Sequence, residues 1–237
     1  MPNDWFKFKK FLIHQDRCAM KVGTDSVMLG AWCSVENVNN ILDIGAGTGI
    51  IALMAAQRST ASIDTVEIDL DAFHQANDNI QESEFTNRIR VIHADFIEFA
   101  KSCTQLYDVI ISNPPYFEEA LKPKDIRRSI ARHAVSLGLR NLIEQSANLL
   151  NERGRLSIII PKDKENQARQ FASGCGLIAA RSLSIQGQSG GQYKRILLEW
   201  SNTNKGPEIA NNLNILDANR RFSPAYVELT RDFYLDF

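Results

Sequence analysis

From residue 41 onward, short apolar runs rich in β-branched residues alternate with segments whose apolar residues recur at a spacing near 3.6. This alternation predicts a parallel α/β sheet with helices on both faces. The last two apolar runs are joined by the glycine-rich stretch QGQSGGQY and not by a helix, so this pair is expected to be antiparallel. The runs are ILDI, SIDTVEI, RIRVIHAD, YDVIIS, GRLSIIIP, LIAARSLSI and KRILLEW, and the helical segments cover about 50–58, 70–84, 138–152 and 163–174.

The length of 237 residues fits one domain with an ordinary core. We predict a single domain over 1–237, with a core at 41–200, an N-terminal extension at 1–40 and a C-terminal extension at 201–237. The N-terminal extension is expected to contain a helix over 24–34. The C-terminal extension is expected to end in a helix at about 224–235, with Ser223 as its cap and Pro224 at its first position.

Charge is distributed unevenly along the chain. The formal net charge is −1, which argues against a uniformly basic nucleic-acid-binding protein. Residues 1–22 and 121–140 are nevertheless basic, whereas residues 64–98 are acidic. This division predicts one face for a polyanion and another face for a different ligand.

The four cysteines, Cys18, Cys33, Cys103 and Cys175, are far apart and form no C-x-x-C pair. They indicate buried thiols, with neither a metal site nor a disulfide framework. No apolar stretch approaches the length that a bilayer requires, so we expect no membrane partner and a cytoplasmic location.

The stretch LDIGAGTGI places Gly45, Gly47 and Gly49 directly after the first strand and at the start of a helix. Backbone N–H groups and the helix dipole face a ligand at such a position. A dinucleotide fingerprint would need a glycine at position 50, which is Ile50 here. A simple tight turn needs one permissive residue, so three glycines favour a ligand-binding loop.

Acidic residues follow the next strands, Glu67 after IDTV and Asp95 after VIHA. In a doubly wound sheet these residues should meet the glycine loop and Asn113 outside the carboxyl ends of the strands. A carboxylate about twenty residues beyond the glycines suits the paired hydroxyls of a ribose. Either carboxylate alone would indicate a helix cap, but their placement on successive strand ends favours a ligand.

A stiff loop, Asn113-Pro114-Pro115-Tyr116, follows the strand YDVIIS. Each proline fixes its own φ and holds the preceding residue extended, so the loop presents acceptor oxygens without competing N–H groups. Two acceptors that take both protons of an exocyclic amine favour a tetrahedral nitrogen, which methylation of that amine requires. Tyr116 and Phe117 could stack on a flipped planar group. The ordinary alternative is a proline-rich turn with a core tyrosine.

The glycine loop with its strand-end Glu67 and Asp95 resembles the class I S-adenosylmethionine-dependent methyltransferases. The resemblance implies a Rossmann-like, seven-stranded, mostly parallel sheet in the order 3-2-1-4-5-7-6. It also implies S-adenosylmethionine as cofactor, with the glycine loop at its methionine part, Glu67 on the ribose and Asp95 at the adenine amine. The implied cofactor set further includes Asp43, Phe96 and Asn113.

The N-P-P-Y loop resembles that of amino-methyltransferases acting on adenine, cytosine or protein glutamine. FKFKKFLIHQDRCAMKVGTDSVMLGAW, LDIGAGTGIIALMAAQR, SNPPYF and the tail FSPAYVELTRDFYLDF together resemble the bacterial tRNA adenine-N6 methyltransferases, which modify the adenosine beside the anticodon of a valine tRNA. This resemblance implies that Lys21, Thr24 and Asp25 help to hold the methionine end of the cofactor. From the residues alone, Thr24 would be a helix N-cap and Asp25 a favourable first-turn charge.

The predicted activity is methyl transfer from S-adenosylmethionine to adenine N6 in tRNA by a monomer without a metal. Rival functions are a protein glutamine N5 methyltransferase, a DNA adenine methyltransferase and a non-catalytic RNA-binding module. For Arg127, Arg128 and Arg132, phosphate clamping and an ordinary solvated face remain equally open. Arg220 and Arg221 are either RNA contacts or ordinary surface. A surface or capping role is favoured over a base for His133, because the reaction does not demand a base. The predicted RNA contacts are Lys9, Lys10, Phe117, Arg127, Arg128 and Arg132.

Overall fold

The computed structural model describes residues 3–115, 137–203 and 206–236. Several residues that the sequence analysis assigned to the substrate side therefore lie outside the described residues: Tyr116, Phe117, Arg127, Arg128, Arg132 and His133.

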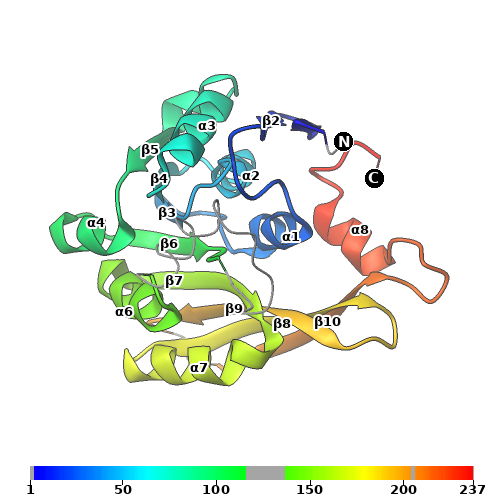
Figure 1. Ribbon diagram of the computed structural model, residues 1–237. Helices are drawn as coiled ribbons and strands as arrows, with labels where there is room; N and C mark the ends of the chain where they lie inside the picture. Colours follow the sequence, from blue (N-terminus) through cyan, green and yellow to red (C-terminus); the bar gives the residue numbers. More distant parts are fainter. Residues whose placement is uncertain (1–2, 116–136, 204–205, 237) are drawn as a thin grey trace, which may run out of the picture.

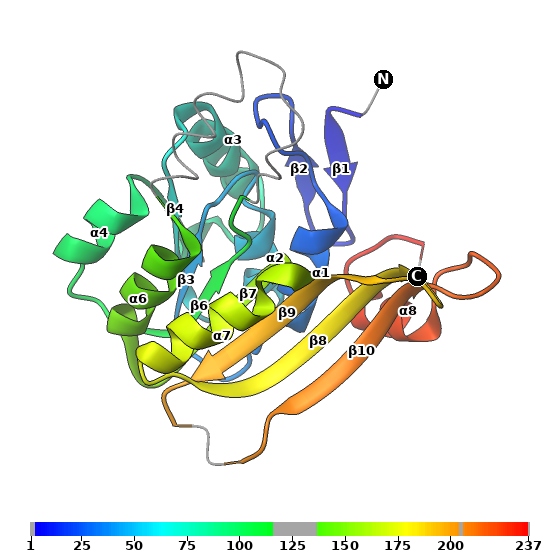
Figure 2. The ribbon, with the colours of Figure 1, turned by 60° about the horizontal axis from the view of Figure 1, so that its bottom comes forward.

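A twisted eight-stranded sheet forms the centre of the molecule, in the order β10-β8-β9-β7-β6-β3-β4-β5 (Figures 1 and 2). The strands pair in parallel except for β7 with β9 and β8 with β9, which pair antiparallel. The predicted order 3-2-1-4-5-7-6 and the antiparallel final pair are confirmed. The strands are β3 (Asn40–Ile44), β4 (Ser62–Glu67), β5 (Ile89–His93), β6 (Tyr107–Ser112), β7 (Leu150–Pro161), β8 (Ile178–Gln188), β9 (Tyr193–Ser201) and β10 (Ile209–Leu216).

The predicted count of seven strands is wrong, because β10 adds an eighth strand beside β8. Its sequence, IANNLNIL, contains three asparagines, and the sequence analysis did not assign a strand to the short apolar run that it contains. An edge strand needs few buried side chains, and Leu213 is the buried residue of β10. The C-terminal extension is therefore built into the sheet.

Helices cover both faces of the sheet (Figures 1 and 2). One buried cluster joins the sheet to α1, α2, α3 and α8, and a second joins it to α4, α6 and α7. The helices are α1 (Thr24–Trp32), α2 (Ile50–Arg58), α3 (Leu70–Gln81), α4 (Phe96–Ser102), α6 (Leu139–Leu149), α7 (Glu165–Gly174) and α8 (Pro224–Thr230), with 3-10 turns at Thr86–Arg88 and Lys162–Lys164. Among the described residues, no helix is long and apolar enough to cross a bilayer.

Two helix ends differ from the expectation. The N-cap of α1 is Gly23 and not Thr24, because Gly23 is extended and its carbonyl accepts the Val27 N–H at 3.3 Å. The cap at Ser223 is confirmed, since its hydroxyl accepts the Tyr226 N–H at 3.1 Å. However, α8 ends at Thr230 and not near 235, and the chain then turns so that Phe233 enters the core.

The N-terminal extension contributes a hairpin that the sequence analysis did not predict, formed by β1 (Trp5–Lys7) and β2 (Leu12–His14). The turn of the hairpin contacts the C-terminal segment: the Lys9 N–H donates to the Phe233 carbonyl at 2.8 Å, and Lys9 Nζ donates to the Arg231 carbonyl at 2.6 Å. The two extensions therefore hold each other in place.

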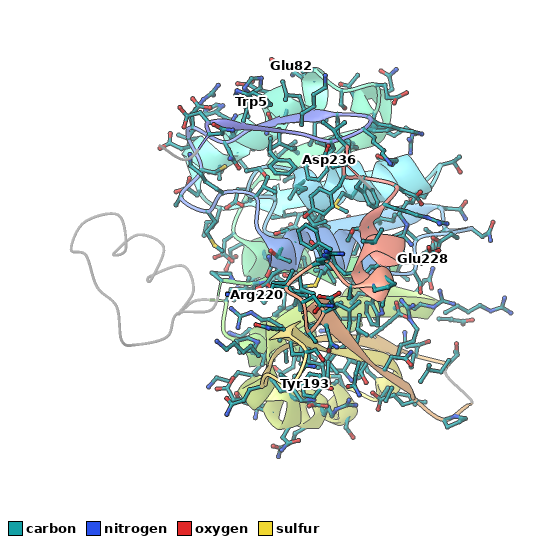
Figure 3. All side chains as sticks on the ribbon, turned by 90° about the vertical axis from the view of Figure 1, so that its right-hand side faces the viewer. Trp5, Glu82, Tyr193, Arg220, Glu228 and Asp236 are labelled. Carbon is teal, nitrogen blue, oxygen red and sulfur yellow. The ribbon has the colours of Figure 1, made fainter. Side chains whose placement is uncertain are left out.

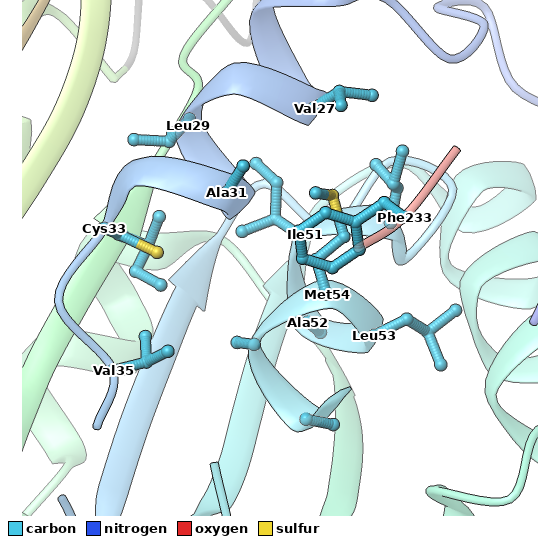
Figure 4. Packing of buried hydrophobic residues seen from close by; sticks show 14 of the residues in the cluster. Val27, Leu29, Ala31, Cys33, Val35, Ile51, Ala52, Leu53, Met54 and Phe233 are labelled. Carbon is cyan, nitrogen blue, oxygen red and sulfur yellow. The ribbon is translucent and has the colours of Figure 1, made fainter. Parts of the chain in front are cut away.

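Helices α1 and α2 pack closely against each other, beside Phe233 (Figure 4). A Cβ at Gly30 would lie 2.7 Å from Met54 Sδ and 3.1 Å from Met54 Cβ, so a larger residue there would require the Met54 side chain to shift. The ring of Phe233, which is 1% exposed, lies among the side chains of both helices. This packing supports α2, the helix that the glycine loop begins.

We predict that Phe233→Ala lowers the free energy of unfolding by about 3–5 kcal/mol, because it leaves a cavity in this core. Urea denaturation of the purified protein measures the change. Leu235→Ala, at a side chain that is 52% exposed, is the matched control and should have little effect. Equal losses in the two variants would contradict the anchoring role of Phe233.

Candidate active site

The glycine loop connects β3 to α2 through three residues with positive φ: 85° at Gly45, 53° at Gly47 and 81° at Gly49. At Gly49, a Cβ would also meet Ile80 and Ala76 of α3 at 3.4–3.5 Å. Other side chains would strain this backbone, which explains the repeated glycine. The Gly45 N–H donates to the Val66 carbonyl at 2.9 Å, which ties the loop to the neighbouring strand β4.

Glu67 ends β4 and accepts three backbone N–H groups. One carboxylate oxygen accepts from Gly47 at 2.8 Å, and the other accepts from Ile68 and Asp69, both at 2.9 Å. Burial raises the pKa of Glu67, although the three hydrogen bonds oppose the increase. The carboxylate thus bridges the glycine loop and the start of α3.

Asp95 follows β5 and caps α4, with Oδ1 accepting the N–H groups of Ile97 at 2.7 Å and Glu98 at 3.3 Å. Asp95 and Phe96 also line the cavity that Glu67 lines. The capping role and a ligand role are therefore compatible, because both cap bonds use the same carboxylate oxygen.

Two adjoining cavities lie outside the carboxyl ends of β3, β4 and β6, with volumes of about 160 and 340 Å³. The first, which we call the acidic cavity, is lined by Glu67, Asp95 and Phe96 together with Cys18 and Pro115. The second, which we call the α1 cavity, is lined by residues 20–26, which lead into α1, and by Pro114. The residues common to both are Met20, Gly45, Gly47 and Asn113.

Asn113 lies where the two cavities meet, directly after β6. Its Nδ2 donates to Ser26 Oγ of α1 at 2.9 Å, which leaves the amide oxygen Oδ1 as the acceptor for a ligand. The sequence analysis missed Ser26, whose only local signal is its position beside the KVGTD segment. The partners are 87 positions apart in the sequence.

The predicted residues of the KVGTD segment, Lys21, Thr24 and Asp25, all line the α1 cavity. Asp25 Oδ2 accepts from Arg195 Nε of β9 at 2.8 Å, and Arg195 lines the same cavity. Lys21 Nζ contacts Asp4 Oδ1 at 3.1 Å. Arg195 is a second residue that the sequence analysis missed.

Asp43 is placed differently from the other predicted cofactor residues. It is 1% exposed, belongs to β3 and is not among the residues that line the two cavities. Thr65 Oγ1 donates to Asp43 Oδ2 at 3.1 Å, and burial raises the pKa of Asp43 to about 7. Asp43 therefore joins β3 to β4 and does not line either cavity. Lys9 and Lys10, on the N-terminal hairpin, also lie outside these linings.

Comparison with known proteins agrees with this arrangement. The family model "Methyltransferase small domain" matches residues 18–171. The chain is 44% identical to a protein of Bacteroides thetaiotaomicron over 237 residues and 41% identical to one of Parabacteroides distasonis over 235 residues, covering 99% of each chain in both pairs. Both relatives are named tRNA1(Val) (adenine(37)-N6)-methyltransferase.

This chain belongs to the methyltransferase small domain family. Solved methyltransferases share its fold at 18% sequence identity. A predicted O-methyltransferase of Agrobacterium tumefaciens superimposes with a TM-score of 0.71, over 88% of this chain and 96% of that chain. The N-methyltransferase NodS of Bradyrhizobium japonicum, solved with S-adenosyl-L-homocysteine, gives a TM-score of 0.54 over 75% and 84%.

The cavities of this family member suit a ligand with a nucleoside arm and an amino-acid arm. The carboxylates of Glu67 and Asp95 in the acidic cavity can accept from ribose hydroxyls and an exocyclic amine. The glycine loop and residues 21–25 border the α1 cavity. S-adenosylmethionine has both arms. Among the described residues, no group of three or more His, Cys, Asp or Glu side chains could hold a metal ion.

We predict that Glu67→Gln weakens S-adenosylmethionine binding by about tenfold to a hundredfold, because it removes one charged acceptor from the acidic cavity. Calorimetry with the purified protein measures this affinity, and NAD should not bind. Glu84→Gln, at an exposed carboxylate beyond α3, is the control. Unchanged affinity in Glu67→Gln would remove Glu67 from the ribose site.

Proposed function

We propose that this protein transfers the methyl group of S-adenosylmethionine to N6 of the adenosine beside the anticodon, adenine 37, in a valine tRNA. The observation that carries the proposal is the placement of Asn113, an oriented amide acceptor where two cavities meet, followed by two prolines. The full-length similarity to the two relatives named for this activity supports the same substrate.

S-adenosylmethionine, when bound, supplies an activated methyl group. We assign its ribose to Glu67, its adenine to Asp95 and Phe96, and its methionine part to the glycine loop with Lys21, Thr24 and Asp25. We assign Asp43, which is buried in β3, no direct contact with the cofactor. The assignment follows the two cavity linings, one containing strand-end carboxylates and the other the start of α1.

Asn113 and Pro114 prepare the amine that is methylated. The N6 lone pair of adenine is delocalised into the ring and is a poor nucleophile. Asn113 Oδ1 and the Pro114 carbonyl can accept the two N–H protons, which favours a tetrahedral nitrogen with its lone pair directed outward. After transfer the nitrogen is cationic and loses a proton readily, so no strong base is needed. Pro115 keeps this backbone rigid.

The remaining contacts are proposed for the RNA side. Tyr116 and Phe117 are assigned to stacking on the flipped adenine, and Lys9, Lys10, Arg127, Arg128 and Arg132 to tRNA phosphates. We take the enzyme to act as a monomer in the cytoplasm. Size-exclusion chromatography with light scattering measures the oligomeric state directly.

Mass spectrometry of N6-methyladenosine tests the function. Purified protein, S-adenosylmethionine and an unmodified valine tRNA transcript should yield the modified base beside the anticodon. Asn113→Ala should lower kcat by about a hundredfold or more, because it removes an acceptor used mainly as the nitrogen becomes tetrahedral. Cofactor affinity should stay nearly unaltered.

Asn87→Ala, at an exposed asparagine of the 3-10 turn before β5, is the matched control and should retain full activity. A near-normal rate for Asn113→Ala would contradict the proposed amine cradle. Methylation of a glutamine-bearing protein, with none of the tRNA, would instead make the protein a glutamine N5 methyltransferase.

Ser26 provides a second test of the cradle. Ser26→Ala removes the hydroxyl that orients the Asn113 amide, so kcat should fall by about tenfold while the affinity for S-adenosylmethionine is kept. Ser26→Thr retains a hydroxyl and should restore most of kcat. Equal kcat values in the Ala variant and the wild type would show that Asn113 is positioned by other contacts.

A further inference from the structure

The hairpin between β8 and β9 extends the sheet outward from the α1 cavity. Arg195 of β9 pairs in register with Pro161, the last residue of β7, and lines that cavity. Tyr193 precedes Arg195 by two residues and lies closer to the turn of the hairpin, about 7 Å from Arg195 at the usual rise of a strand. Tyr193 and Lys194 are exposed. The hairpin thus leads from the cavity that Asn113 borders to an exposed aromatic ring and an exposed cation.

The loop 217–222 lies beside this hairpin, because the Ser189 N–H donates to the Leu216 carbonyl at 3.0 Å. Figures 1 and 2 show the two connections together at the same end of the sheet. The Asp217 N–H donates to the Arg221 carbonyl at 2.8 Å, and Asp217 Oδ1 accepts the N–H groups of Asn219 and Arg221. The carboxylate of Asp217 therefore accepts from backbone N–H groups of its own loop.

Three exposed cations lie on these connections: Lys194, Arg220 and Arg221. In the part of the chain that the structure describes, none of them forms an ion pair, whereas Arg195 is paired with Asp25. Figure 3 shows this end of the molecule with Tyr193 and Arg220 labelled. Arg220 has a φ of 61°, a conformation in which arginine is uncommon. At position 220 the loop thus has an arginine in a backbone conformation that would be less strained for glycine or asparagine.

Phe222 adds a flat apolar surface next to the two arginines. Its side chain is 51% exposed, and its ring stacks on Tyr226 with centroids 5.3 Å apart and an interplanar angle of 23°. Tyr226 is itself 2% exposed and belongs to the core. One face of the Phe222 ring is thus covered by a rigid support. An exposed aromatic ring on the same loop as two exposed arginines suits nucleobase stacking together with phosphate contacts.

We infer that Tyr193, Lys194, Arg220, Arg221 and Phe222, which we call the edge platform, bind the tRNA outside the base that is methylated. This inference rests on the proposed function, since it concerns the RNA of that same reaction. The three cations bind backbone phosphates, and Phe222 stacks on an unpaired base or an exposed end of a base stack. The platform contributes to tRNA affinity and not to the methyl-transfer step.

The charge of the platform is tested with the double variant Arg220→Gly and Arg221→Gln. Glycine accepts the positive φ at position 220, so the melting temperature should not fall. With the valine tRNA transcript, the slope of log affinity against log salt should become shallower by about two, and KM for tRNA should rise about tenfold at moderate salt. Both kcat and S-adenosylmethionine affinity should remain at the wild-type values.

Lys101→Gln with Arg153→Gln is the matched control, because it removes two exposed positive charges near the start of β6 and β7, at the end of these strands that lies away from the β8–β9 hairpin. Its salt slope should equal that of the wild type. If the platform double variant is less stable than the wild type, Lys194→Gln, which alters no loop backbone, carries the same test with an expected change of about one in slope.

The stacking role is tested separately with Phe222→Leu and Phe222→Trp. Leucine keeps an apolar contact with Tyr226 but removes the flat ring, so tRNA affinity should fall about tenfold. Tryptophan keeps a stacking surface and should bind nearly as well as the wild type. Equal binding by both variants would overturn the stacking role.

The outcomes separate the platform from the proposed function. If the wild type methylates tRNA and the platform variants have the same KM for tRNA and the same salt slope as the wild type, the platform is overturned and the function stays intact. If the wild type binds tRNA without methylating it, and the variants bind tRNA more weakly, the platform is supported and the function is overturned. Absence of tRNA binding by the wild type would overturn both.

Discussion

The buried carboxylate of Glu67 holds together the segments from which the acidic cavity is built. Its oxygens accept from Gly47 in the glycine loop and from Ile68 and Asp69 before α3, so one side chain fixes two strand–helix connections. A buried carboxylate is unfavourable unless hydrogen bonds compensate for the lost hydration. The three backbone donors provide this compensation, and one of them, the Gly47 N–H, belongs to a residue with the positive φ that glycine allows. Loop conformation and carboxylate burial therefore require each other.

Helix α1 is held at both ends by arginines from the far strands of the sheet. Asp25 at its start pairs with Arg195 of β9. At its end, Arg181 Nη2 of β8 donates to the Trp32 carbonyl at 2.9 Å, its guanidinium lies 4.1 Å from the Trp32 ring, and it pairs with buried Glu199. The position of Ser26, and with it the Asn113 amide, is thus determined by strands outside the glycine-loop half of the sheet.

The sequence predicted the parts of the molecule whose signals are local. Helix α2 has the predicted bounds, and the alternation of buried runs with helices predicted the parallel sheet. The strand order itself was implied by the resemblance to the class I methyltransferases. The hairpin β1–β2 was missed because three-residue strands have no readable period, and β10 because its edge position tolerates asparagines. Ser26 and Arg195 were missed for another reason: their partners are 87 and 170 positions away, so no local spacing indicates them.

The contact between Lys9 and Arg231 joins positions 222 apart in the sequence. Chains are made from the N-terminus, so Phe8 and Phe11 emerge from the ribosome long before Tyr226 and Phe233, which share their core cluster. Until the later segment is synthesised, the apolar surface around α2 lacks part of its cover. We expect this core to close as a late folding event, and the newly made chain to need protection from aggregation until then.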